Sequence, residues 1–259
     1  MALNNQQFGR SSEAIVYPIL LLVVLWLIYW ADHLFPLTPF YKYGVVPQTA
    51  EGIKGILFMP LIHAKDEFEH ILNNSLPTAI LVGALIYFYR EIALRVFLLS
   101  WLLTGIGLWA FAANTNTYHI GMSGVIYAMA GFLFTSGVIR KYRPLQGISL
   151  FVAFVYGSMI WGIFPMKPHV SWEGHLSGLV VGVLIAILYR KRGPQPPKYQ
   201  YEIEKEMGIE PPDLEGIYNE KLRQQELMRI LREQEAEEGH RIVYHYTPTD
   251  QPKPDKDQQ

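Results

Sequence analysis

The sequence contains no cysteine and little charge for its length. Without cysteine among its 259 residues, disulfide bonds and thiolate-ligated metal sites are excluded. Only 17% of the residues are charged, whereas a soluble domain usually carries about a quarter. Half of the residues are hydrophobic. The composition therefore favours a chain that buries apolar surface in a membrane over an ordinary soluble domain.

Several hydrolase motifs are also missing. Gly121-Met-Ser-Gly lacks the second glycine of G-x-S-x-G, which excludes an α/β-hydrolase elbow. There is no H-E-x-x-H, against a membrane zinc protease, and no G-x-G-D, against a membrane aspartyl protease. His63, Glu67 and His70 are spaced so that they could share a helix face and bind a metal. We disfavour this site because charged residues in loops are usually solvated. We therefore predict no metal, no organic cofactor and no nucleic-acid partner.

Six apolar segments fill the first three quarters of the chain: 15–30, 70–89, 96–113, 121–139, 147–165 and 174–189. Most are near the length of about 20 residues that a helix needs to cross a bilayer. Helices are expected because hydrocarbon offers no partners to open strand edges. The first segment has no small-residue cleavage site after it, so we interpret it as a retained span. The fold class predicted is an all-α membrane protein, a bundle of six transmembrane helices.

Basic residues orient this bundle, because Lys and Arg favour cytoplasmic loops. Among the connections between the segments, arginine occurs only after the second and the fourth segment. Together with the exit of the sixth segment, these positions hold Arg90, Arg95, Arg140, Arg143, Arg190 and Arg192. The opposite side has only Lys42, Lys54, Lys65 and Lys167. Both termini are therefore predicted in the cytoplasm, with the even-numbered segments running from outside to inside. Without a targeting peptide, a bacterial inner membrane is favoured.

The domain division follows the charge. We expect a cytoplasmic segment 1–14, a membrane domain 15–192 and an acidic cytoplasmic tail 193–259. Residues 193–212 are rich in proline and charge, which is typical of a linker. Residues 211–239 predict an amphipathic helix that begins near Asp213 and ends near Gly239. This helix is a candidate for binding a partner or for self-association, and a weakly ordered, solvated tail is the alternative.

Polar residues gather at one end of the even-numbered segments. His70 and Asn74 open the second, Ser123 the fourth and His175 the sixth. Polar groups inside a membrane are costly and usually face the bundle interior, so this placement indicates a site. A serine nucleophile needs a base, and histidine is the usual one. Spacing alone does not choose between the two histidines.

Small residues favour His175 as that base. Gly174, Gly178 and Gly182 recur at intervals of four, and the fourth segment carries a similar stripe of Gly124, Ala128 and Gly131. Such stripes let membrane helices approach closely, which would place His175 beside Ser123. An imidazole N–H and an amide from the second segment would then be donors for a developing oxyanion. Two further histidines, His119 and His169, fall in external loops and are interpreted as surface residues.

These motifs resemble those of the rhomboid intramembrane serine proteases. "GMSGVIYAMAG" is similar to their fourth-helix motif G-x-S-G followed by Tyr-Ala and a later glycine. "GHLSGLVVG" is similar to their sixth-helix motif of histidine with close glycines, and "HILNN" to their second-helix H-x-x-x-N. The resemblance covers about residues 15–192. One departure is His63, which lies seven residues before His70, where many rhomboids have a histidine five residues before.

The resemblance implies a Ser-His dyad with no third acid. Ser123 would be the nucleophile and His175 the base, and the Ser123 backbone N–H, His70 and Asn74 would form the oxyanion hole. Tyr127 would pack against His175 and fix its ring. The glycines Gly121, Gly124 and Gly178 would support this site, and residues 31–69 would form an external loop of short helices at the outer interface.

The function expected is proteolysis of transmembrane proteins in or near the outer leaflet, with the lipid bilayer and membrane-spanning substrates as partners. The main alternative is a catalytically silent rhomboid-like protein that binds membrane segments for quality control. Such relatives usually lack the serine or the histidine, and this chain has both. A small transporter is disfavoured because inverted repeats and paired broken helices are missing.

Overall fold

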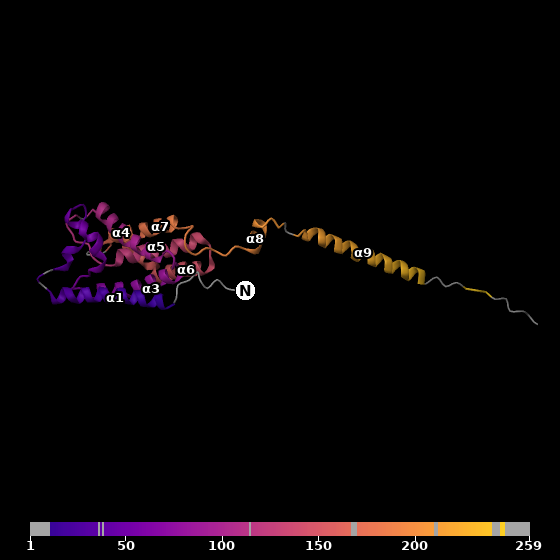
Figure 1. Cartoon of the computed structure of the whole chain (residues 1–259), viewed down its shortest axis with the longest axis horizontal. Coiled ribbons are helices and arrows are strands. Elements are labelled where there is room, and N and C mark those ends of the chain that lie inside the picture. The colour runs from indigo at the N-terminus through magenta and orange to yellow at the C-terminus, as the bar shows by residue number, and fades with distance from the viewer. Residues whose placement is uncertain are drawn as a thin grey trace, which may run out of the picture. The chain divides into compact units, whose positions relative to one another are not determined.

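The computed structural model describes residues 11–35, 37, 39–113, 115–166, 170–209, 212–239 and 244–246 (Figure 1). Its contacts divide the chain into two units, Met1–Pro197 and Lys198–Gln259. The described residues form helices and connecting loops without a named strand. An isolated antiparallel bridge joins Val45 to His119. The all-α prediction is therefore confirmed for the described part of the chain.

The first unit is a helix bundle in which a helix lies at each of the six predicted segments. These helices are α1 Ser11–Leu34, α3 Phe68–Phe88, α4 Ala93–Phe111, α5 Ser123–Arg140, α6 Arg143–Tyr156 and α7 Trp172–Leu188. A 3₁₀ helix, η4 (Gly157–Ile163), continues α6. Five of these stretches are long and apolar enough to cross a membrane, and α7 is a shorter apolar helix of 17 residues.

Short helices fill the connection between α1 and α3. They are η1 Phe40–Tyr43, η2 Glu51–Lys54, α2 Gly55–Phe58 and η3 Met59–Leu61. The connection packs against α4, where the Trp101 indole N–H donates to the Leu57 carbonyl at 3.0 Å. The Trp109 indole N–H likewise donates to Thr49 at 2.9 Å. The connection is thus held to the bundle by hydrogen bonds from two tryptophans of α4.

Helix α5 is the centre of the bundle and packs against α3, α4, α6 and α7. Its most intimate partner is α7, because the small residues of the two helices face each other. A Cβ on Gly178 would overlap the carbonyl oxygen of Gly124, and one on Gly182 would overlap that of Ala128. Larger side chains would hold the backbones apart, so the glycines set the distance between these helices.

Arg140 holds the far ends of α5 and α7 together. Its guanidinium donates to the carbonyls of Tyr189 at 2.7 Å, Arg192 at 2.6 Å and Pro194 at 2.9 Å. A cation at the carbonyl end of a helix is favourable because it complements the helix dipole. Arg140 is only 6% exposed and is a structural clamp as well as a basic residue of this side.

The second unit contains α8 Gln200–Glu206 and α9 Leu214–Gly239. The α9 boundaries agree with the predicted helix, and the Asp213 carboxylate accepts the Gly216 N–H at 2.8 Å at its start. Helix α8 lies in the stretch predicted as a linker. It is stabilised locally, because the Tyr199 N–H donates to the Glu202 carboxylate at 2.9 Å and Lys198 pairs with Glu206 at 2.6 Å. No described residue of α8 or α9 is buried.

Candidate active site

A serine and a histidine meet where α5 and α7 begin. Ser123 is the first residue of α5, and His175 lies in the first turn of α7. The Ser123 Oγ lies 2.9 Å from the His175 Nε2, within hydrogen-bond distance. The imidazole is 9% exposed, and the serine is partly exposed. The contact follows from the glycine stripes, because they bring the two backbones close one turn below.

The other ring nitrogen of His175 determines which nitrogen carries the proton. Its Nδ1 lies 2.9 Å from the carbonyl oxygen of Gly162, in η4. A carbonyl only accepts hydrogen bonds, so Nδ1 is the protonated nitrogen and Nε2 presents its lone pair to the Ser123 hydroxyl. In this arrangement a backbone carbonyl orients the imidazole, in the position where many serine hydrolases use a carboxylate. Sequence reasoning missed Gly162.

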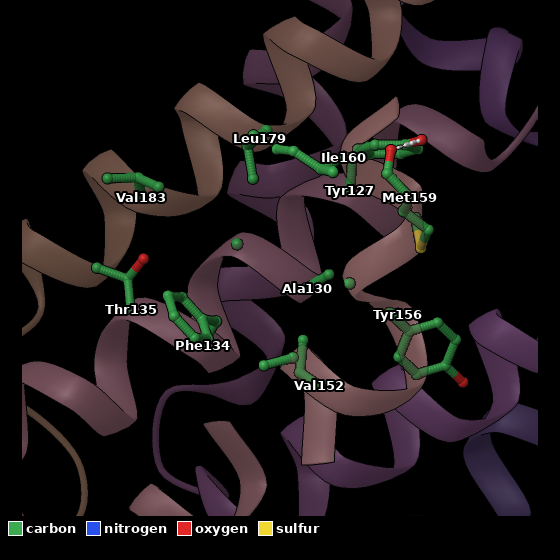
Figure 2. A pocket seen from close by; sticks show the side chains of 13 residues that line it. Tyr127, Ala130, Phe134, Thr135, Val152, Tyr156, Met159, Ile160, Leu179 and Val183 are labelled. Carbon is green, nitrogen blue, oxygen red and sulfur yellow. Dashed lines mark hydrogen bonds between the residues drawn. The ribbon is translucent and has the colours of Figure 1, made fainter. Parts of the chain in front are cut away.

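Tyr127 covers one face of this imidazole. The two rings are stacked with centroids 4.2 Å apart and planes 9° from parallel. The Tyr127 hydroxyl donates to the Met159 carbonyl at 2.6 Å, as the dashed line in Figure 2 shows. Residues of η4 therefore accept hydrogen bonds from both rings. Tyr127 thus packs against His175, as the resemblance led us to expect, whereas the contact with Met159 was not anticipated.

Two residues of α3, His70 and Asn74, converge on Gly121. A Cβ on this glycine would lie 2.7 Å from the His70 Nε2 and 3.8 Å from the Asn74 Nδ2. Gly121 also has a φ of +111°, which side chains rarely adopt. Within the described residues, the buried Asn74 Nδ2 has no hydrogen-bond partner. Two nitrogens that can donate thus lie beside the backbone that leads into Ser123, in space that only glycine leaves open.

His63 supports this group from the preceding loop. It is 2% exposed, and its ring packs edge-on against His70 with centroids 5.1 Å apart. Its Nε2 accepts the Met122 N–H at 3.4 Å. Burial, and secondarily the neighbouring His70, lower the pKa of His63 to about 3, so it is neutral at physiological pH. Although His63 lies seven residues before His70, where many rhomboids have a spacing of five, the His63 ring still packs against the site.

His119 is buried, in contrast to its interpretation as a surface residue. Its backbone pairs with Val45 in both directions, at 2.8 and 2.9 Å, and its Nδ1 lies 2.7 Å from the Ser171 Oγ. Ser171 caps α7 by accepting the Gly174 N–H at 3.3 Å. These bonds tie the loop before α5 to the start of α7, which sequence spacing does not reveal. His169 lies outside the described residues.

No group of three or more metal-ligating side chains occurs among the residues that the structure describes. His63, Glu67 and His70 thus do not form such a cluster. The residues that converge are instead a hydroxyl, an imidazole with its lone pair towards that hydroxyl, and two nitrogen-bearing side chains. This set is suited to acyl transfer, in which a nucleophile, a base and oxyanion donors act together.

Known proteins resemble this chain over the same region. Residues 51–192 match the Rhomboid domain family. An uncharacterized protein of Mycobacterium tuberculosis is 34% identical over 153 residues, 56% of this chain and 62% of that relative. An uncharacterized protein of Mycobacterium leprae is 30% identical over 141 residues, 52% of this chain and 55% of the relative. The chain thus spans about six tenths of the length of these mycobacterial relatives.

A relative with a named activity is more distant. The rhomboid protease GlpG of Pectobacterium atrosepticum is 30% identical over 105 residues, 39% of this chain and 37% of that protein. The site residues described above, from His63 to His175, all fall within the range 51–192 that the family matches.

Proposed function

Because this chain belongs to the rhomboid family of intramembrane serine proteases, we propose that it cleaves transmembrane proteins with a dyad of Ser123 and His175. The observation that carries the proposal is the 2.9 Å contact between the Ser123 Oγ and the His175 Nε2, with the Nδ1 proton directed at Gly162. A serine hydroxyl is a weak nucleophile alone and needs such a base.

The proposed reaction has two halves. The Ser123 Oγ attacks the scissile carbonyl carbon while His175 Nε2 takes its proton. The imidazolium then gives this proton to the leaving amine, the C–N bond breaks and an acyl-enzyme remains. A water that passes its proton to Nε2 hydrolyses the ester and restores the serine. Throughout, the Gly162 carbonyl and the stacked Tyr127 keep the ring in place.

The oxyanion formed in each half requires donors. His70 and Asn74 are proposed to supply them, because their nitrogens lie at Gly121 and the Asn74 Nδ2 has no other partner among the described residues. The Ser123 backbone N–H is a third donor, since the first N–H groups of a helix have no acceptor within it. Donors placed before the charge develops cost no reorganisation during the reaction.

We further propose that α7 is a sixth span. Its 17 residues rise about 26 Å, slightly less than the hydrocarbon core of about 30 Å. The dyad lies at the starts of α5 and α7, whereas Arg140 and the residues that follow α7 lie at the opposite end. With arginine on the cytoplasmic side, the site faces the outer leaflet of a bacterial inner membrane and both termini are cytoplasmic.

The test is cleavage of a model transmembrane substrate by the purified protein in phospholipid vesicles. Wild type should cleave it, Ser123→Ala should abolish cleavage, and His175→Ala should be nearly as damaging because the two residues act as a unit. Ser158→Ala, an exposed serine in η4, is the matched control and should retain activity. Binding of the substrate by a folded wild-type protein without any cleavage would instead support a catalytically silent binder.

A further inference from the structure

An apolar cavity of about 390 Å³ lies between α5, α6 and α7, below Tyr127 and η4. Figure 2 shows the side chains of the three helices directed into it. Most of the lining is hydrocarbon, and it includes Ala130, Phe134, Val152, Ile160, Leu179 and Val183. The cavity lies apart from the reacting atoms, since neither Ser123 nor His175 lines it.

The cavity lies where α6 and α7, which both pack on α5, scarcely contact each other. Helices α5 and α6 are in close contact where the Ser149 hydroxyl donates to the Phe134 carbonyl at 2.7 Å. About one and two turns further along α6, Val152 and Tyr156 line the cavity. Helices α6 and α7 share few contacts, and both pack mainly on α5. A slot between α6 and α7 therefore remains over the face of α5.

The slot is elongated along the helix axes. Its lining on α5 runs from Tyr127 to Thr135, a rise of about 12 Å. On α7 it includes Leu179 and Val183, one turn apart. Lipid chains run roughly parallel to membrane-spanning helices, whereas an amino-acid side chain of a substrate would enter across them. The shape therefore suits a hydrocarbon chain.

The mouth of the slot is continuous with the apolar outer surface of the bundle. Phe134 and Ile160 on its rim are 44% and 45% exposed, and neighbouring Phe154 and Val180 are exposed as well. In a membrane protein this surface is covered by lipid, so hydrocarbon is what the mouth meets. An apolar cavity of this kind stays dry, and an acyl chain restores the dispersion contacts that an empty slot lacks.

We infer that this cavity binds one acyl chain of a membrane lipid, and that the bound chain supports η4 from below. Met159 and Ile160 of η4 line the cavity. The same 3₁₀ helix accepts the hydrogen bonds of Tyr127 and His175, through Met159 and Gly162. The bound acyl chain therefore influences the orientation of the His175 imidazole. This coupling rests on the proposed protease function, whereas acyl-chain binding does not rest on it.

The binding is tested by photolabelling in the Ser123→Ala background, where proteolysis plays no part. The protein is reconstituted in phosphatidylcholine vesicles doped with a phosphatidylcholine that carries a diazirine midway along one acyl chain. After irradiation, labelled residues are located by mass spectrometry. Labels are expected at cavity residues of α5, α6 and α7. Ala130→Phe, whose ring would occupy the slot, should lose these labels, as should Val183→Phe from the opposite wall.

The matched control is Val138→Phe, which adds the same ring on the exposed side of α5 outside the cavity and should leave the labels unchanged. Thermal melting identifies any variant that fails to fold. If one of the two variants that fill the cavity, Ala130→Phe and Val183→Phe, does not fold, the other still provides the test. Labels spread evenly over the exposed faces, or labels that both filling variants retain, would overturn the inference. Displacement of the labels by a saturating transmembrane substrate would also overturn it, because the slot would then belong to the substrate.

To test the coupling of the bound acyl chain to η4, kcat and KM of the protein with Ser123 intact are measured in detergent before and after phosphatidylcholine is added. The lipid should raise kcat with little change in KM, and Ala130→Phe should remove this response while Val138→Phe preserves it. An equal response in both variants would refute the coupling to η4. A wild type that is labelled but never cleaves would refute the protease proposal and leave acyl-chain binding intact.

Discussion

Helices α5 and α6 are consecutive in the chain yet differ sharply in their surroundings. In the most apolar stretch of α5, 72% of the residues are buried, against 17% in the most apolar part of Arg143–Ile163, which forms α6 and η4. The buried helix carries Ser123 and meets the glycines of α7. The peripheral stretch supplies two backbone carbonyls, from Met159 and Gly162. The distance between Ser123 and His175, the proposed nucleophile and base, is thus set by the tightly packed pair of α5 and α7. The orientation of the His175 ring is set by the loosely packed stretch that contains η4.

This difference assigns separate physical roles to the two regions. Changes at the contact of α5 with α7 should alter the separation of the reacting atoms and act strongly on the rate. Changes at the hydrogen bonds to η4 should alter only ring orientation and act moderately. Changes on the exposed face of α6 outside the cavity, or beyond the bundle, should have little effect.

Among changes outside the proposed dyad, the largest effect is expected for Gly178→Leu. A Cβ there would overlap the Gly124 carbonyl oxygen, so a leucine must push α7 away from α5. A displacement of about 1 Å can cost about 100-fold in rate, and we expect a loss in kcat/KM of this order. Gly147→Leu on α6 is the matched control, because an added Cβ there meets no atom within 4 Å. Equal activity of the two variants in the vesicle assay would remove the contrast between the helices.

A moderate effect is expected for Tyr127→Phe. The stacked ring remains, but the 2.6 Å hydrogen bond to Met159 is lost. A net hydrogen bond is worth about 0.5–1.5 kcal/mol, which corresponds to a loss of about 2- to 12-fold in kcat with KM unchanged. Tyr17→Phe, on the exposed face of α1, should keep wild-type kcat. A loss for Tyr127→Phe as large as for His175→Ala would mean that η4 controls more than ring orientation.

A smaller, pH-dependent effect is expected at His63. Because its pKa is lowered from 6.5 to about 3, the unfolded chain binds a proton between these values that the folded chain does not. The stability that His63 contributes is therefore full above about pH 6.5 and is lost as the pH falls towards 3. The melting temperature should decline less steeply on acidification in His63→Gln, whose amide still accepts the Met122 N–H. An unchanged slope in a folded His63→Gln protein would show that His63 does not contribute this pH dependence.

The smallest effect is expected for removal of the tail. We place the truncation after Pro197, because Arg140 donates to the Pro194 carbonyl and a cut at Gly193 would remove this acceptor. The site residues lie in Met1–Pro197, so the truncated protein should cleave the substrate at the wild-type rate. A monodisperse truncated protein with activity as low as Ser123→Ala would show that the tail takes part in the reaction.

The sequence predicted the helices well because most of the apolar segments are near the length that crosses a membrane. It also indicated which side chains to bring together, since Ser123 and His175 each stand beside a glycine stripe that constrains the packing. These stripes are visible as spacing in the sequence. The contact between the two side chains then follows from the packing of α5 on α7.

The remaining parts of the site had no comparable signal. Gly162 and Met159 contribute backbone carbonyls, which every residue possesses, so their identity shows nothing of their role. His119 follows a polar stretch that is typical of exposed loops, and it is held by long-range contacts with Val45 and Ser171 that its sequence neighbours do not reveal. The cavity arises because α6 and α7 pack on α5 but scarcely on each other, a feature that apolar composition does not encode.

Activation of Ser123 by His175 can be tested by covalent labelling of the serine. The detergent-solubilised protein is treated with a fluorophosphonate, and the modified residue and its labelling rate are determined by mass spectrometry. The account predicts modification of wild type at Ser123, none in Ser123→Ala and a labelling rate near background in His175→Ala. Modification at another serine, or an undiminished rate at Ser123 in a folded His175→Ala protein, would contradict it.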